Sequence, residues 1–191
     1  LSSVKGDVSV ATNGFLKGNN LEELIEVYMG DLVGEANFER FGTLFPLLIK
    51  YLDCNDKLSV QVHPDDELAE ERHSSYGKTE AWYILDCSDD AELIYGFNKE
   101  LTPDEFRKSI EDNTFLDYVN KVKVKKGDVF FMQAGTIHAI GSGILIAEIQ
   151  QNSNTTYRVY DYGRLQNGKP RELHVEKAID VTSTKAIDAS G

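Results

Sequence analysis

The chain is poor in cysteine, proline and long hydrophobic runs. Its 191 residues include two cysteines, four prolines and one tryptophan. Two cysteines build no disulfide framework, and Cys54 and Cys87 each follow an aspartate at an expected strand end, so we expect two reduced thiols. No apolar stretch approaches the roughly 20 residues that cross a bilayer, and no secretory leader pattern opens the sequence. We therefore expect a cytoplasmic protein with no membrane partner.

Positive charge is also scarce. Lysine and arginine total 20 against 32 aspartates and glutamates, which gives a formal net charge of −12. No basic run offsets this charge, so nucleic acid and anionic membranes are excluded as expected partners. A small anionic ligand would need cations placed locally, and we expect any such site to use the lysines and arginines that lie near the motifs.

The period of the apolar residues predicts a mainly β protein. A helix is expected after Asn20, where Leu21, Leu24 and Ile25 recur at helical spacing, and a second at 103–112, behind the capping box of Thr102 and Glu105. Short runs rich in β-branched and aromatic residues predict strands at 45–52, 58–62, 81–85, 92–95, 122–124, 129–132, 144–149 and 155–160. The spacing suits a double-sheet jelly roll with a few short helices, forming a single domain over residues 1–191.

Two further expectations concern histidines and the end of the chain. His73 is expected to be exposed, and His174 is expected to open a late helix, so neither is assigned to a site. Residues 182–191 lose the apolar pattern and are expected to fray.

Four metal-ligand candidates come from three separate segments. Gln61 and His63 are two residues apart, so on an extended strand their side chains emerge on the same face. Glu80 follows in Gly77-Lys78-Thr79-Glu80, and His138 in Gly135-Thr136-Ile137-His138. A nitrogen and oxygen ligand set without a thiolate suits zinc or another borderline divalent cation.

These segments resemble those of type I mannose-6-phosphate isomerases. The resemblance extends in family order over residues 13–15, 45–50, 58–63, 77–80, 135–139, 154–161 and 172–174. It implies a cupin jelly roll of the short bacterial form that binds one Zn²⁺ per chain through Gln61, His63, Glu80 and His138. It also implies interconversion of mannose 6-phosphate and fructose 6-phosphate, with a small sugar phosphate as partner. Family members are longer, so this sequence is expected to be a fragment or core of a longer chain.

The resemblance also implies roles for cations. Arg158 corresponds to the family's catalytic arginine, and its high pKa suits charge stabilisation better than proton abstraction. The base that moves the proton between C1 and C2 stays open among Lys78, Glu148 and a metal-bound water. Lys50, Ser59 and Arg164 are the expected contacts of the 6-phosphate.

Two rival functions use the same residues. His63, Glu80 and His138 without Gln61 form a two-histidine, one-carboxylate set that holds Fe(II) in cupin oxygenases. The other rival is a non-catalytic, metal-containing cupin that senses sugars. The sequence predicts no oligomeric state.

Overall fold

Two antiparallel sheets form the body of the protein in this computed structural model, which describes residues 1–189. The four-stranded sheet has the order β3 (Leu47–Cys54), β10 (Ile144–Gln151), β5 (Glu80–Cys87) and β8 (Val129–Met132). The five-stranded sheet has the order β11 (Tyr157–Tyr160), β4 (Val60–Val62), β9 (His138–Ile140), β6 (Glu92–Phe97) and β7 (Val119–Lys123). The predicted mainly β, double-sheet fold is confirmed.

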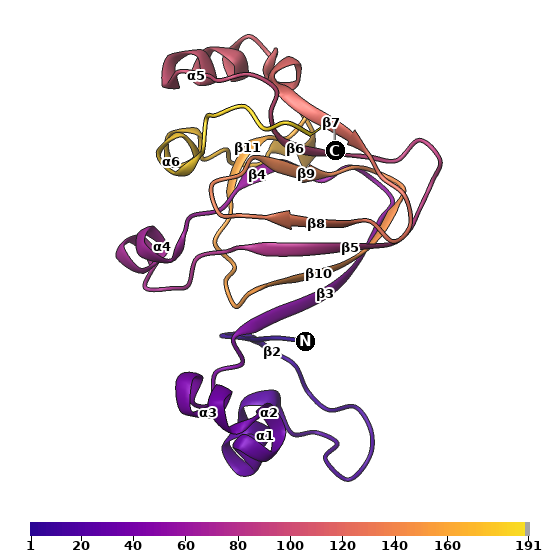
Figure 1. The fold of residues 1–191 in the computed structure, drawn as a ribbon, viewed down its shortest axis with the longest axis vertical. Helices are drawn as coiled ribbons and strands as arrows, with labels where there is room; N and C mark the ends of the chain where they lie inside the picture. Colours follow the sequence, from indigo (N-terminus) through magenta and orange to yellow (C-terminus); the bar gives the residue numbers. More distant parts are fainter. Residues whose placement is uncertain (190–191) are drawn as a thin grey trace.

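Short helices lie around the sheets (Figure 1). Helix α5 (Pro103–Glu111) begins at the predicted capping box, in which Thr102 and Glu105 bond each other's backbone N–H. Asn20 caps α1 (Leu21–Tyr28) in the same way, with Glu23 as the partner. These caps occupy donors that the first helical turn leaves free. The remaining elements are β1 (Ser3–Val4), β2 (Asp7–Val8), α2 (Gly30–Val33), α3 (Glu35–Phe41), α4 (Asp66–His73), the 3₁₀ helix η1 (Phe115–Tyr118), β12 (Leu165–Gln166), β13 (Lys169–Pro170) and α6 (Val175–Val181).

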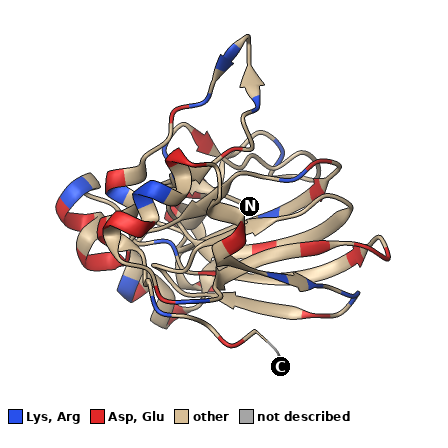
Figure 2. Cartoon of the chain, turned by 90° about the horizontal axis from the view of Figure 1, so that it is seen from above, with Lys and Arg blue, Asp and Glu red and all other residues tan. Residues whose placement is uncertain are grey.

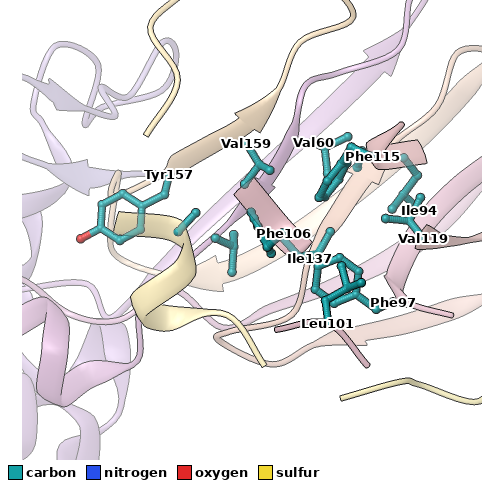
Figure 3. Packing of buried hydrophobic residues seen from close by; sticks show 13 residues of the cluster. Val60, Ile94, Phe97, Leu101, Phe106, Phe115, Val119, Ile137, Tyr157 and Val159 are labelled. Carbon is teal, nitrogen blue, oxygen red and sulfur yellow. The ribbon is translucent and has the colours of Figure 1, made fainter. Parts of the chain in front are cut away.

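The five-stranded sheet packs on both of its faces. On one face, Val60 and Val62 of β4 join a cluster that includes Phe106 of α5, Phe115 of η1 and Ala178 of α6 (Figure 3). On the other face, a second cluster joins it to the four-stranded sheet; Ile140 of β9 and Ile146 of β10 are members. Because side chains alternate along a strand, residues 59, 61 and 63 face the space between the sheets.

The opposite face of the four-stranded sheet carries exposed apolar side chains. Tyr51, Tyr83 and Val129 lie in one cross-strand row with Ala147, and are 76%, 42% and 67% exposed. Acidic and basic residues are interspersed along the helices, strands and loops of the chain (Figure 2). Among the described residues, no helix has the length and apolar character needed to cross a bilayer.

The expectation that residues 182–191 fray is wrong for the part that the structure describes. Ile187 N–H donates to the carbonyl of Phe97 at 2.9 Å, and Asn120 Nδ2 donates to the carbonyl of Ile187 at 2.9 Å. Leu101 N–H also donates to the carbonyl of Thr184 at 3.3 Å. Hydrogen bonds with Phe97 of β6, with the Asn120 side chain of β7 and with Leu101 therefore hold a segment that has little apolar pattern of its own. Residues 190–191 lie outside the described part.

Candidate metal centre and inter-sheet site

His63, Glu80 and His138 converge between the two sheets. Glu80 is the first residue of β5 in the four-stranded sheet, whereas His138 begins β9 and His63 follows β4 in the five-stranded sheet. The Nε2 of His63 lies 3.1 Å from Oε1 of Glu80, and the Nε2 of His138 lies 3.6 Å from Oε2. All three side chains are about 99% buried or more. The sequence-predicted ligands from different segments therefore share one location.

The two imidazoles direct their Nε2 atoms toward the carboxylate. Nδ1 of His63 lies 3.0 Å from the carbonyl of Thr155, and Nδ1 of His138 lies 2.8 Å from the carbonyl of Thr136. A carbonyl only accepts hydrogen bonds, so in the neutral ring each Nδ1 carries the proton and each Nε2 carries a lone pair. Ligand histidines of metal sites are oriented by this same kind of contact.

The cluster fits a divalent cation. Both Nε2 atoms and Oε1 of Glu80 are buried and have no hydrogen-bond partner, and their ligand atoms lie within 4.8 Å of one another. Buried polar atoms without partners are costly, and three that face each other call for a cation. Ligands about 2.0 Å from a tetrahedral zinc ion lie roughly 3.3 Å apart. The separations of 3.1 and 3.6 Å bracket that value.

The protonation states also suit metal binding. Burial, followed by the neighbouring Lys78, lowers the pKa of His63 to about 3, against the opposing effect of Glu80. Burial alone would raise the pKa of Glu80, but His63, His138 and Lys78 outweigh it and hold this pKa well below its usual range. The site thus contains a neutral imidazole and an ionised carboxylate near pH 7, the forms that bind metals.

Gln61 and Arg158 lie on the same face of the five-stranded sheet as His138. Gln61 of β4 pairs directly with His138 of β9 and with Arg158 of β11. Residues paired across strands project to one side, so this row carries an amide, an imidazole and a guanidinium toward the four-stranded sheet. The Nη1 of Arg158 donates to the carbonyl of Glu172 at 2.9 Å, whereas its Nε is buried without a partner.

Lys78 and Glu148 are charged neighbours of Glu80. Lys78 Nζ lies 3.4 Å from Oε1 of Glu80 and donates to Oγ1 of Thr156 at 3.3 Å. Glu148 of β10 accepts from Lys50 Nζ at 2.9 Å. Burial lowers the pKa of Lys78, although Glu80 opposes this effect. Burial, together with the charge of Glu80, raises the pKa of Glu148. Both pKa values move toward neutrality.

The three expected phosphate contacts are not joined to one another. Lys50 of β3 is held by Glu148 and by Oε1 of Gln150, at 2.6 Å from the latter. Ser59 is buried on the inter-sheet face of the segment that leads into β4. Arg164 is bonded to Asp161 at 2.6 Å and to the carbonyl of Lys57, beside the turn that precedes Ser59. No hydrogen bond or ion pair connects Lys50 with Ser59 or Arg164 within residues 1–189.

The two unassigned histidines behave as expected. His73 is exposed, and its Nε2 lies 2.7 Å from the hydroxyl of Tyr157. His174 immediately precedes α6, and its Nδ1 accepts from the backbone N–H of Arg158. Cys54 and Cys87 are free, as predicted.

Sequence reasoning missed the side chains that support the centre. Trp82 Nε1 donates to Oε2 of Glu80 at 3.0 Å and to Oε1 of Glu148 at 3.2 Å. Gln150 holds Lys50 through its oxygen and the carbonyl of Ser153 through its nitrogen. The signal for Trp82 was present, because it lies two residues after Glu80 on a strand, the same spacing that linked Gln61 with His63.

Comparison with known proteins gives one consistent family. The description "Phosphomannose isomerase type I, catalytic domain" matches residues 5–95. The mannose-6-phosphate isomerase ManA of Bacillus subtilis is 49% identical over 181 residues, covering 94% of this chain and 56% of that relative. The mannose-6-phosphate isomerase of Streptococcus mutans is 44% identical over 182 residues, covering 95% and 56%.

A solved structure agrees. The crystal structure of the mannose 6-phosphate isomerase from Bacillus subtilis superposes with a TM-score of 0.83 at 40% identity, covering 99% of this chain and 59% of the other. The present chain therefore spans little more than half the length of these relatives.

Proposed function

Because this chain belongs to the type I phosphomannose isomerase family, we propose that it forms the metal-binding catalytic domain of a mannose-6-phosphate isomerase. The reaction interconverts mannose 6-phosphate and fructose 6-phosphate by moving a proton between C1 and C2. The observation that carries the proposal is the convergence of two imidazole Nε2 atoms and a buried carboxylate oxygen that have no hydrogen-bond partner, with Lys78 Nζ 3.4 Å from that oxygen as its ion-pair neighbour.

We propose that Gln61, His63, Glu80 and His138 hold one Zn²⁺. Nitrogen and oxygen ligands without thiolate suit this ion, and Gln61 lies directly across the strand pair from His138. When bound, zinc supplies Lewis-acid polarisation of the sugar oxygens at C1 and C2. The carbonyls of Thr155 and Thr136 fix the two imidazole rings in the ligand tautomer.

Lys78 and Glu148 are the proposed proton carriers. General acid and base catalysis is most effective when the pKa lies near the working pH, and burial moves the pKa values of both groups in that direction. Glu80 and Glu148 are shifted in opposite senses, so one stays ionised as a ligand while the other can hold a proton. Arg158 stays charged and stabilises the negative oxygen that develops as the carbon loses its proton.

Lys50, Ser59 and Arg164 are the proposed contacts of the 6-phosphate. Lysine, arginine and hydroxyl donors are the usual partners of a phosphate dianion. Lys50 would exchange part of its contact with Glu148 for the phosphate, and Arg164 is already oriented by Asp161. In an acidic protein this local cation set is what admits an anionic sugar.

The test combines metal analysis with an isomerase assay. We expect close to one zinc per chain and conversion of mannose 6-phosphate that a chelator abolishes. His138→Ala should remove most of the metal and the activity together, whereas His73→Ala, which changes an exposed histidine, should retain both. Unchanged metal content in His138→Ala would refute the ligand assignment. Bound iron without isomerase activity would favour the cupin oxygenase. Bound zinc without isomerase activity would favour the non-catalytic, sugar-sensing cupin.

A further inference from the structure

The only tryptophan of the chain lies between two buried carboxylates. Trp82 of β5 is 1% exposed, and its Nε1 lies 3.0 Å from Oε2 of Glu80 and 3.2 Å from Oε1 of Glu148. An indole ring has a single N–H group, so both carboxylates share one donor. The ring also meets His138 edge to face, with centroids 5.3 Å apart. Trp82 therefore contacts two residues of the metal cluster and one proposed proton carrier.

The shared N–H determines how the Glu80 carboxylate is turned. Oε1 faces His63 at 3.1 Å and Lys78 at 3.4 Å, while Oε2 lies within reach of Trp82 and of His138 at 3.6 Å. Without a donor at Oε2, rotation about the terminal torsion of Glu80 would be opposed only by packing and by the ion pair of Oε1 with Lys78, since this torsion is intrinsically broad. A directional hydrogen bond in a low-dielectric interior restricts it.

We propose that Trp82 is a positioning residue, whose indole N–H fixes the Glu80 carboxylate for metal binding and ties it to Glu148. This inference rests on the proposed metal site. The proposed role differs from that of a residue that only fills the core. Such a residue contributes through the packing of its side chain, whereas Trp82 would also contribute through its N–H group. Ile84, two residues further on β5 and fully buried in the same cluster, provides that comparison.

The decisive change removes the N–H and keeps the ring. Because the chain has one tryptophan, growth with a tryptophan analogue in which sulfur replaces the N–H group alters this position alone. Trp82→Phe is the genetically encoded counterpart, and Ile84→Val is the control for lost packing. Zinc affinity is measured by competition with a chromophoric chelator, and folding of the metal-free proteins by thermal unfolding.

We expect the sulfur analogue and Trp82→Phe to bind zinc about 10- to 100-fold more weakly, as is typical for loss of an outer contact to a metal ligand. Ile84→Val should lose some thermal stability and keep its zinc affinity. In the unsubstituted protein, zinc should also change the fluorescence of Trp82, and His138→Ala should abolish that change.

The outcomes separate this inference from the proposed function. If the unsubstituted protein binds zinc and the sulfur analogue binds it within about twofold, the positioning role is overturned while the metal site stands. If Ile84→Val weakens zinc binding as much as the analogue does, packing accounts for the effect and the inference is again overturned. If the unsubstituted protein binds no zinc, the proposed function and this inference fall together.

Discussion

The guanidinium of Arg158 has one buried donor, Nε, without an acceptor. Burial and the positive charge of Arg171 lower its pKa, although the negative charges of Asp161 and Glu172 oppose this effect. A guanidinium in such surroundings loses hydration that one carbonyl contact does not replace. The negative oxygen of a reacting sugar on the inter-sheet face would offset this cost.

Replacing Arg158 tests that interpretation. We expect Arg158→Ala to lower kcat by about 100- to 1,000-fold, the usual effect of removing one charge-stabilising donor, with little change in zinc content. Arg107→Ala is the matched control, because Arg107 pairs with Glu176 at the surface near α6 and should leave both quantities unchanged. Near-normal turnover in Arg158→Ala would remove this residue from the catalytic step.

Arg164 is expected to distinguish phosphorylated from plain sugar. We predict that Arg164→Ala raises KM for mannose 6-phosphate by about 10- to 100-fold, in line with the loss of a charge-assisted hydrogen bond. Any slow conversion of mannose should be unaffected, and this substrate serves as the control within the same variant. An equal loss of activity toward both sugars would show that Arg164 maintains the fold around Asp161 and does not bind the phosphate.

At the residue scale, strand alternation predicted which side chains share a face. Gln61 and His63 were joined by their spacing, and their shared face follows because Val60 and Val62 pack on the other side. The placement of Glu80 beside them depends on pairing between distant strands, for which the sequence contains no local signal. Only the family resemblance placed Glu80 and His138 in the same site.

At the scale of elements, Gly77 joins two segments that carry site residues. A Cβ atom on Gly77 would lie 2.5 Å from the backbone of Asp65 and Asp66. The N–H of Gly77 donates to the Asp66 carboxylate at 2.9 Å, and the N–H of Lys78 donates to the carbonyl of Pro64 at 3.1 Å. The segment after His63 and the segment before Glu80 are therefore held in close backbone contact.

Gly77→Ala should disturb folding and metal binding together. The methyl group meets backbone that cannot move aside like a flexible side chain, so we expect a loss of about 1–3 kcal/mol in the free energy of unfolding, as for other overpacked sites. Zinc affinity should fall because His63 and Glu80 are pushed apart. Gly127→Ala is the control: its Cβ meets open space, but a φ of +93° costs about 1 kcal/mol. Equal zinc affinities in the two variants would contradict the coupling.

Elements with a strong local signal were predicted, and those without one were not. Helix α5 was predicted from the capping box of Thr102 and Glu105, and the long strands were predicted from their content of β-branched and aromatic residues. Helix α4, with the sequence Asp66–His73, has almost no apolar stripe and is defined by the Asp65 cap and its surface position. Strand β9 has only three residues, and pairing with β4 and β6 makes it a strand.

For the molecule as a whole, the cluster of His63, Glu80 and His138 connects the two sheets. Glu80 belongs to the four-stranded sheet, whereas His63 and His138 belong to the five-stranded sheet. An ion bound to all three residues would link the four-stranded sheet to the five-stranded sheet. A ligand that binds only the folded state stabilises it by about 2.7 kcal/mol when present at 100 times its dissociation constant.

Removal of zinc should therefore lower thermal stability, and acid should lower the Tm of the protein both with and without zinc. At pH 7.5 we expect a chelator to lower Tm by about 5–10 °C, because 1 kcal/mol corresponds to roughly 2–4 °C in a chain of this size.

The pKa of His63 falls from 6.5 in the unfolded chain to about 3 in the metal-free folded protein. Below pH 6.5 the unfolded chain thus binds a proton that the folded protein does not, so stability falls toward pH 3. Glu80 acts in the same direction below pH 4.5, because its folded pKa is also lowered. In the folded protein His63 and Glu80 are still deprotonated at pH 5, so zinc displaces no proton from them there. Both Tm values should therefore fall from pH 7.5 to pH 5, and the difference between them should persist. Thermal unfolding at both pH values measures it, and His138→Ala should show no chelator effect at either. A chelator effect that persists in His138→Ala would place the stabilising ion at a different site.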